Sequence, residues 1–253
     1  MITIDILGIG LLAPGFIGWE SGRAVLKGLY PFEPVGTPDP VAALLPSNER
    51  RRSSACVKWA VHVAQEAIAQ SRLDPRDVLT VFASSEGEMD VFDKLCRTLA
   101  TQERLVSPTL FHQSVHNTAA GYWGIATTGQ QSSTAISCFD DSFAAGLLEA
   151  VTIADVEQRP VLLVAYDLNV PTPLRDARSI TTGFAVAIAL APQSPGPLAR
   201  MQLRLQEGHA HEENGMKDPT LERVRRDNPA ARSLPLLSAI AAGNQQTVRL
   251  KLL

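Results

Sequence analysis

Two kinds of hydrophobic pattern alternate along the chain. Short runs rich in aliphatic residues predict five buried strands, and an edge strand is expected after them. These six strands are expected at residues 2–9, 78–83, 132–139, 160–166, 184–190 and 199–206. In the segments between them apolar residues recur every three or four positions, which predicts helices. The helices are expected at residues 53–71, 89–100, 117–127 and 141–156.

The alternation of strands and helices predicts an α/β domain with a mixed, mostly buried sheet and helices on both of its faces. Residues 161–165 are apolar without alternation, as expected of a strand that is covered on both sides. Five prolines between residues 31 and 46 predict a loop. We therefore expect one domain with a five-stranded core over residues 1–206.

Residues 207–253 differ from this pattern and are expected to pack on the same domain as an appendage. Within them, residues 209–219 are polar, which predicts a loop. A short apolar helix is expected at 234–242 and ends at Gly243. Alternating apolar and polar residues at 247–252 then predict a last strand.

The composition changes this picture little but excludes several classes of protein. A chain of 253 residues, 45% of them hydrophobic, can bury one large core, and a net charge of −3 gives no indication of nucleic-acid binding. The apolar N-terminus has no basic residue before Arg23 and is interrupted by Pro14, so neither a signal peptide nor a membrane span is predicted. Three widely spaced cysteines fit a reducing compartment, and we expect a cytoplasmic protein.

A glycine pattern at the end of the first strand resembles the dinucleotide-binding fingerprint. Gly8, Gly10 and Ala13 have the required spacing. The fingerprint also needs a helix that starts at the glycines, because the amides of its first turn bind the pyrophosphate. Pro14 and Gly15 follow immediately instead. The sequence therefore disfavours dinucleotide binding, and no cofactor is expected.

Candidate catalytic side chains gather at the start of the helix predicted at 141–156. Asp140 and Asp141 suit a helix start, where carboxylates satisfy free amides and complement the helix dipole. Cys138 would be a nucleophile there, but two adjacent carboxylates disfavour its thiolate, so a buried strand cysteine is the favoured interpretation. His112 and His116 have metal-ligand spacing on a helix without a third ligand nearby, so no metal site is expected.

Four segments of the chain, in order and at matching distances, resemble β-ketoacyl synthases. They are residues 7–14 with Trp19 and Gly28, residues 107–121, residues 132–150 and residues 183–190. In that family they are the opening strand and helix, the dimer-interface segment, the strand and helix that carry the nucleophilic cysteine, and a later strand. The resemblance covers roughly residues 1–206 and implies half of a thiolase-like fold.

Two departures from the family pattern concern catalysis. Counted from the interface asparagine, which matches Asn117, the family's nucleophile position is occupied by Asp140, and the family's serine then matches Ser142. Cys138 falls two residues early, and a two-residue deletion would restore it. The family's two catalytic histidines come from a second half of the fold that is not expected in this chain. The resemblance therefore implies that the chain has no catalytic residue of its own.

A synthase-like chain without these groups resembles the chain-length factors, which are catalytically silent partners of active synthases. The short form resembles the partners found in aryl polyene biosynthesis. This implies a heterodimer with a β-ketoacyl-[acyl carrier protein] synthase in a type II pathway that resembles polyketide or fatty-acid synthesis, and transient contact with the acyl carrier protein. The matching interface segment gives the candidate interface and tunnel-lining residues, which are Leu110, Phe111, Ser114, His116, Asn117, Gly121, Tyr122 and Trp123.

Two other functions stay open on the sequence. One is a small thiolase-like acyltransferase that uses Cys138, and the other is a binding protein without an enzymatic partner. Transfer of a mass-tagged acyl group from its carrier protein to the chain would identify the acyltransferase. Co-purification with a synthase would exclude the solitary binding protein.

Overall fold

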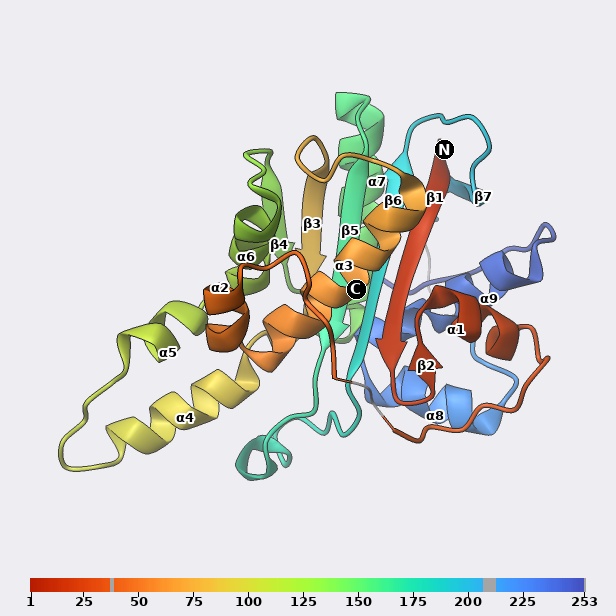
Figure 1. The fold of residues 1–253 in the computed structure, drawn as a ribbon. Coiled ribbons are helices and arrows are strands. Elements are labelled where there is room, and N and C mark those ends of the chain that lie inside the picture. Colours follow the sequence, from red (N-terminus) through yellow and green to blue (C-terminus); the bar gives the residue numbers. More distant parts are fainter. Residues whose placement is uncertain (37–38, 207–212, 253) are drawn as a thin grey trace.

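The computed structural model describes residues 1–36, 39–206 and 213–252, which are built on a seven-stranded sheet (Figure 1). The strands are β1 Ile2–Ala13, β2 Phe16–Ile17, β3 Leu79–Ala83, β4 Ser133–Ile136, β5 Val161–Asp167, β6 Phe184–Ala191 and β7 Ala199–Leu203. Their order is β2, β1, β6, β5, β3, β4, and β7 also pairs with β1. β3 is parallel to β4 and β5, whereas β6 is antiparallel to β5 and β1. The predicted α/β class with a mixed sheet is confirmed.

Helices cover both faces of the sheet (Figure 1). They are α1 Trp19–Leu26, α2 Ser47–Arg52, α3 Ala55–Ser71, α4 Met89–Leu99, α5 Pro108–Gln113, α6 Thr118–Thr127, α7 Ser142–Glu157, α8 Pro219–Asp227 and α9 Leu234–Ala242. α3 and α6 pack in one hydrophobic cluster, and α7, α8 and α9 pack in a second cluster against the sheet. α4 and α5 extend away from the sheet as an arm, residues 89–113.

The glycines of β1 let α3 approach this strand at backbone distance. A Cβ atom on Gly8 would lie 2.2 Å from the carbonyl oxygen of Ala67, and one on Gly10 would lie 2.0 Å from that of Val63. Any side chain at either position would therefore push the helix off the sheet. The glycine pattern serves helix–strand packing, and β1 continues through it to Ala13 where a dinucleotide site would need a helix to start.

Two polar side chains of α3 also bind the backbone of β1 and the start of α1. Glu66 accepts hydrogen bonds from Leu11 N at 3.0 Å and from Trp19 N at 2.6 Å. Gln70 accepts one from Ile9 N at 2.7 Å. Burial raises the pKa of Glu66, and these amide donors offset part of that effect. The position of α3 thus fixes both the strand and the helix that follows it.

The sheet differs from the prediction in two places. Beside the five predicted buried strands and the predicted edge strand, which forms as β7, the sheet has a seventh strand, the short β2, which pairs with β1 and was not predicted. The predicted strand at 247–252 does not form. Its alternation arises because Val248 and Leu250 pack against the core, while Asn214 exchanges two hydrogen bonds with Arg249, too few for a ladder.

Helix α8 was not predicted, because its sequence falls at the end of a polar segment. Asp218 caps it, accepting hydrogen bonds from Thr220 N at 2.8 Å and Leu221 N at 2.9 Å, and Pro219 stands in its first turn. This cap and proline were readable from the sequence. The rest of the loop predicted at 209–219 is partly outside the described residues, which omit 207–212.

The end of α8 is fastened to the main domain by two adjacent side chains. Asp227 accepts hydrogen bonds from Thr181 N, Thr181 Oγ1 and Thr182 N at 2.8–3.1 Å. Asn228, which is fully buried, donates to Asp167 O at 2.9 Å and to Thr182 O at 2.8 Å. The C-terminal segment is therefore tied to the end of β5 and to the loop before β6.

Replacing Gly10 tests the contact between α3 and β1. Gly10→Ala should lower the free energy of unfolding by about 3 kcal/mol or more, since no flexible side chain can move away from the new methyl group. Gly124→Ala is the matched control, because its Cβ would lie 3.8 Å from the nearest atom and alanine favours a helix. Urea unfolding followed by tryptophan fluorescence measures both. Equal stability of the two variants would contradict the packing argument.

Candidate functional site

The carboxyl ends of the three parallel strands β3, β4 and β5 lie together at one end of the sheet. Loop 84–88 follows β3, turn 137–141 follows β4, and Asp167 ends β5. In α/β sheets ligand-binding groups gather at the carboxyl ends of the strands. These three segments, with the side chains that contact them, form the candidate site.

The turn between β4 and α7 is a tight strand-to-helix elbow. Its tip is Phe139, with a left-handed φ of 48°, which is uncommon for a residue other than glycine. Ser142 holds the turn: its hydroxyl accepts from Cys138 N at 3.0 Å and donates to Phe139 O at 2.6 Å. The Phe139 ring is 58% exposed, so the elbow presents an aromatic side chain. Cys138 is half-buried and Asp140 follows the tip.

Arginines from distant parts of the chain pair with the carboxylates of the elbow. Asp140 binds Arg178 Nη2 through Oδ1 at 2.6 Å and Arg232 Nη2 through Oδ2 at 3.0 Å. Arg178 also binds Glu86 at 2.6 Å, and its guanidinium carbon lies 4.1 Å from the centroid of the Phe139 ring. Neither arginine could be predicted from the sequence, because no local pattern distinguishes them from the other arginines of the chain.

The expectation that Asp140 and Asp141 cap the helix is wrong. Neither carboxylate accepts a hydrogen bond from the first amides of α7 within the described residues. Asp141 is 3% exposed and its Oδ1 lies 3.1 Å from Arg232 Nη1. Burial raises the pKa of Asp141, which the adjacent guanidinium counteracts. Both carboxylates form ion pairs with arginine side chains and do not cap the helix.

Behind the ion pairs, Asp167 organises the loop after β3. It is fully buried, and its Oδ1 accepts from Ser84 Oγ at 2.9 Å and from Glu86 N at 3.0 Å. Its other oxygen has no hydrogen-bond partner among the described residues. Burial raises the pKa of Asp167 to about 7, more than these donors can offset.

A second buried carboxyl, Glu88, joins the same loop to the start of α3. Its Oε1 accepts from the hydroxyl of Ser54, the capping residue of α3, at 2.5 Å. Cys56 Sγ lies nearby and donates to Gly87 O at 3.3 Å. Burial raises the pKa of Glu88 to about 7. The loop that leads into the arm is therefore held from both sides by carboxyl groups without a basic partner in the described part of the chain.

The predicted interface segment runs from the arm towards this loop. Phe111 is 67% exposed, and Asn117 and Gly121 are also exposed, whereas Leu110, Ser114 and His116 are half-buried. His116 Nε2 donates to Ser84 O at 2.9 Å, so the end of the segment reaches the candidate site. Six of the eight candidate interface residues are thus at or near the surface.

Tyr122 and Trp123 do not fit the interface prediction. They are 4% and 3% exposed, and both side chains pack in the hydrophobic cluster of α3. Aromatic residues suit a protein interface and a domain core equally well, so the sequence could not separate the two. They lie on the side of α6 that packs against α3, which makes them part of the core of this chain.

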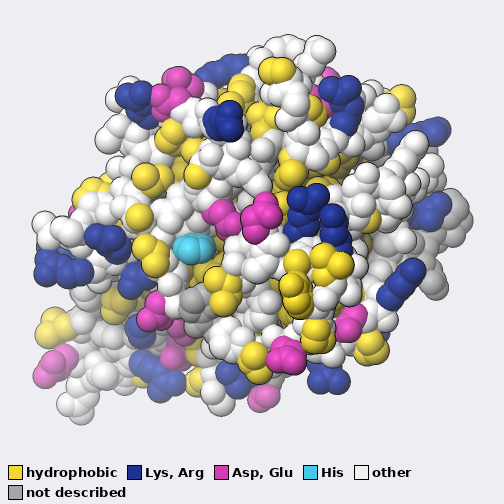
Figure 2. Space-filling model, turned by 45° about the vertical axis from the view of Figure 1, so that its right-hand side comes forward, with side chains coloured by type: hydrophobic (Ala, Val, Ile, Leu, Met, Phe, Trp, Pro, Cys, Tyr) yellow, Lys and Arg dark blue, Asp and Glu magenta, His cyan; other side chains and the backbone are white. Residues whose placement is uncertain are grey.

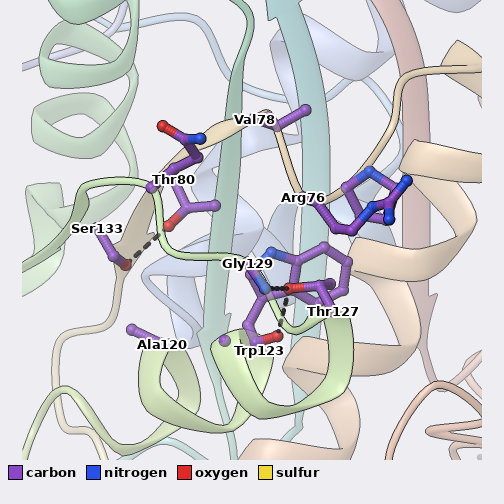
Figure 3. Close-up of a pocket in the computed structure, with 11 residues that line it drawn as sticks. Arg76, Val78, Thr80, Ala120, Trp123, Thr127, Gly129 and Ser133 are labelled. Carbon is purple, nitrogen blue, oxygen red and sulfur yellow. Dashed lines mark hydrogen bonds between the residues drawn. The ribbon is translucent and has the colours of Figure 1, made fainter.

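Two small cavities lie away from the elbow. One, about 30 Å³, is lined by Trp123, Thr127 and Gly129 of α6 and the turn after it, and by the first residues of β3 and β4 (Figure 3). A second, about 10 Å³, lies beside Cys56 and Glu88. Each has room for one or two water molecules, whereas small-molecule sites usually measure several hundred Å³. Neither suits an acyl chain.

The described residues hold no group of three His, Cys, Asp or Glu side chains that could bind a metal ion. His112 lies on α5, which ends at Gln113, so it does not share a helix face with His116. No helix within the described ranges is both long and apolar enough to span a bilayer.

Comparison with known proteins identifies the family. A sequence model described as the N-terminal domain of β-ketoacyl synthase matches residues 27–251. The chain belongs to the β-ketoacyl synthase family. Among curated protein sequences none matches this family member.

Solved structures of this family share its fold. A chain of the ketosynthase (ApeO) in complex with its chain length factor (ApeC) from Xenorhabdus doucetiae is 25% identical, with a TM-score of 0.71. The match covers 97% of this chain and 94% of that one. A β-ketoacyl synthase from Burkholderia phymatum STM815 is 15% identical with a TM-score of 0.61, and the match covers 76% of this chain and 59% of that one. The thiolase-like fold is therefore confirmed.

A third similar structure is the type II polyketide complex AntDE:AntF, an acyl-carrier protein with its ketosynthase. It is 12% identical with a TM-score of 0.63, and the match covers 75% of this chain and 62% of that one. The segments that resemble β-ketoacyl synthases in sequence therefore belong to a chain that has the fold of this family.

The stability of the chain should depend on pH through Asp167. In the folded state its pKa is about 7, against 3.8 for the free side chain, so between these values the folded chain binds the proton more strongly. Stability should therefore fall as pH rises from about 4 to about 7 and then level off. Asp167→Asn should reduce this fall and raise stability at pH 8 most.

Urea unfolding of wild type and Asp167→Asn at several pH values measures the effect. Asp155→Asn, on the exposed side of α7, is the matched control and should leave the pH profile as in wild type. Glu88 titrates in the same range and should leave a residual slope in the variant. Parallel profiles for wild type and Asp167→Asn would contradict the assignment.

Proposed function

We propose that the chain is a non-catalytic partner of the chain-length-factor type that pairs with a β-ketoacyl-[acyl carrier protein] synthase. The observation that carries the proposal is the tip of the elbow. The corresponding turn of the family presents the nucleophilic cysteine, whereas here it presents the ring of Phe139. An aromatic ring cannot accept an acyl group. The next residue, Asp140, binds two arginines and is not a thiol either.

The similarity to the ApeO–ApeC complex supports the same role. The matched chain of that complex is covered over 94% of its length, so it is nearly as short as this one. That complex unites a ketosynthase with its chain length factor. The assignment to a type II pathway for aryl polyenes, and transient contact with an acyl carrier protein, follow from the resemblance and belong to this proposal.

The surface of the arm supports a protein partner. Five large apolar side chains of the arm and the residues just after it are at least half exposed, namely Phe92, Leu99, Leu105, Phe111 and Val115. Exposed apolar side chains in such number mark interaction surfaces. On the face drawn in Figure 2, acidic and basic side chains lie side by side among apolar ones.

The edge of the sheet supports it as well. β4 is a terminal strand, and within the described residues it pairs with β3 alone. Ser133 and Ala135 are exposed along it. An uncovered strand edge offers free backbone groups to a second chain. We infer that the synthase covers the arm and this edge together.

Interface variants test the proposal directly. Phe111→Asp should weaken co-purification with the tagged synthase of the same pathway by at least about tenfold, because a buried interface anchor is lost and a charge is introduced. Val156→Asp is the matched control, since Val156 is 72% exposed on α7, away from the arm. Size-exclusion chromatography should show a one-to-one complex for wild type and control. If the wild-type chain eluted as a monomer in the presence of the synthase, the proposed function would be wrong.

The competing function is an acyltransferase that uses Cys138, and the half-buried thiol beside the elbow tip is the observation in its favour. We expect Cys138→Ala to leave pathway output within a few-fold of wild type, measured as product per cell. Replacing the nucleophilic cysteine of the synthase is the control and should abolish output. A loss of about a thousandfold with a folded Cys138→Ala protein would establish the acyltransferase.

A further inference from the structure

A chain of alternating charges crosses the carboxyl ends of the parallel strands. It starts at Glu86 after β3 and passes through Arg178 to Asp140 on the elbow. From Asp140 it continues to Arg232, in the turn before α9. Each link joins segments that are far apart in the sequence. The carboxyl ends of the strands, where ligands usually bind in such sheets, are therefore occupied by side chains of the protein itself.

The far end of this chain of charges lies in the C-terminal segment. Arg232 Nη1 is 3.1 Å from Asp141 Oδ1 and 3.8 Å from Glu213 Oε2. Glu213 in turn binds Arg225 of α8 at 3.0 Å. Residues 213–232 thus contain both the arginine that binds the elbow and an acid that lies next to this arginine.

We propose that residues 213–232 form a strap that closes the elbow, and that Asp140 is the positioning residue to which the strap is fastened. The inference deepens the proposed function and rests on it, because a partner that accepts no acyl group does not need open space at the carboxyl ends of these strands. Asp140 holds Arg232 of the strap on one oxygen and Arg178 on the other. Arg178 then supports the ring of Phe139 at the strained tip.

The strap itself is anchored by Asp227 and the buried Asn228, but water still reaches the ion pairs that join it to the elbow. The side chains of Arg178, Arg232 and Asp140 are 15%, 20% and 35% exposed. Ion pairs with this exposure are weakened by salt, whereas the hydrophobic contacts of α9 are not. The contact of Arg232 with the elbow should therefore loosen at high ionic strength, while α8 and the remainder of the fold stay in place.

The three cysteines are built-in reporters of this opening. Cys138 is half-buried directly before the elbow tip, Cys96 is exposed on α4, and Cys56 is buried in the first turn of α3. Iodoacetamide labelling of the full chain, followed by mass spectrometry of the three peptides, gives one rate for each. We expect Asp140→Asn and Arg232→Ala to raise the rate at Cys138 by about tenfold, because local opening controls access.

The controls separate the strap from a general loss of stability. Asp140→Glu keeps the charge and should label close to wild type at Cys138. Arg226→Ala removes an arginine of α8 whose side chain is 75% exposed and should change nothing. In wild type, raising the salt from about 0.05 to about 1 M should speed labelling at Cys138 alone, and in Asp140→Asn this salt effect should disappear.

Unchanged labelling of Cys138 in both variants and at all salt concentrations would overturn the strap. A parallel rise at Cys56 would overturn it too, since it would mean that the whole domain loosens. The same variants should still co-purify with the synthase, because they leave the exposed apolar side chains of the arm and the backbone of β4 unchanged. Failure of wild type to bind any synthase would refute the proposed function and would leave the labelling result standing by itself.

Discussion

The contact between α3 and β1 at backbone distance sets the position of the candidate site. Gly8 and Gly10 let the helix lie directly on the strand, and Glu66 fixes its depth by binding two backbone amides. The first turn of the same helix then meets the loop after β3, where Ser54 binds Glu88. A helix displaced outwards by one methyl group would move its capping serine away from this loop. Packing at one end of the sheet thus determines the geometry at the other.

The site contains carboxyl groups in two different electrostatic situations. Asp140 and Asp141 face arginines, which cannot lose their charge, so these pairs remain ionic. Asp167 and Glu88 have no basic partner within the described residues and lie beside hydroxyl and amide donors, and burial raises their pKa values to about 7. The site thus combines carboxylates fixed in ion pairs with carboxyl groups that can bind protons. Chemistry with an acyl thioester would need a thiol and open space here, and the elbow offers a ring and ion pairs.

The local parts of this structure could be predicted from the sequence, and the long-range parts could not. The unbroken apolar run of β5 and the periodicity of α3 specify their elements, because each depends on burial alone. The pairing of Arg178 and Arg232 with Asp140 joins segments 38 and 92 residues away, and sequence spacing gives no access to such contacts. Counting residues from Asn117 pointed to Asp140 and not to Phe139 as the elbow tip, because residue spacing does not reveal which residue adopts the left-handed conformation. Residues 247–252 alternate correctly but lack a neighbouring strand.

The antiparallel pairing of β1 with β6 places Asp5 opposite Ala191, so the first strand of the chain has its partner near the other end. During synthesis β1 leaves the ribosome long before that partner exists. At typical translation rates the delay is on the order of ten seconds. An apolar strand without a partner is prone to aggregate. α3 is made early in this interval, and its surface already fits the glycines of β1. Helix and strand can therefore protect each other until the sheet closes, which makes α3 a natural nucleus for folding.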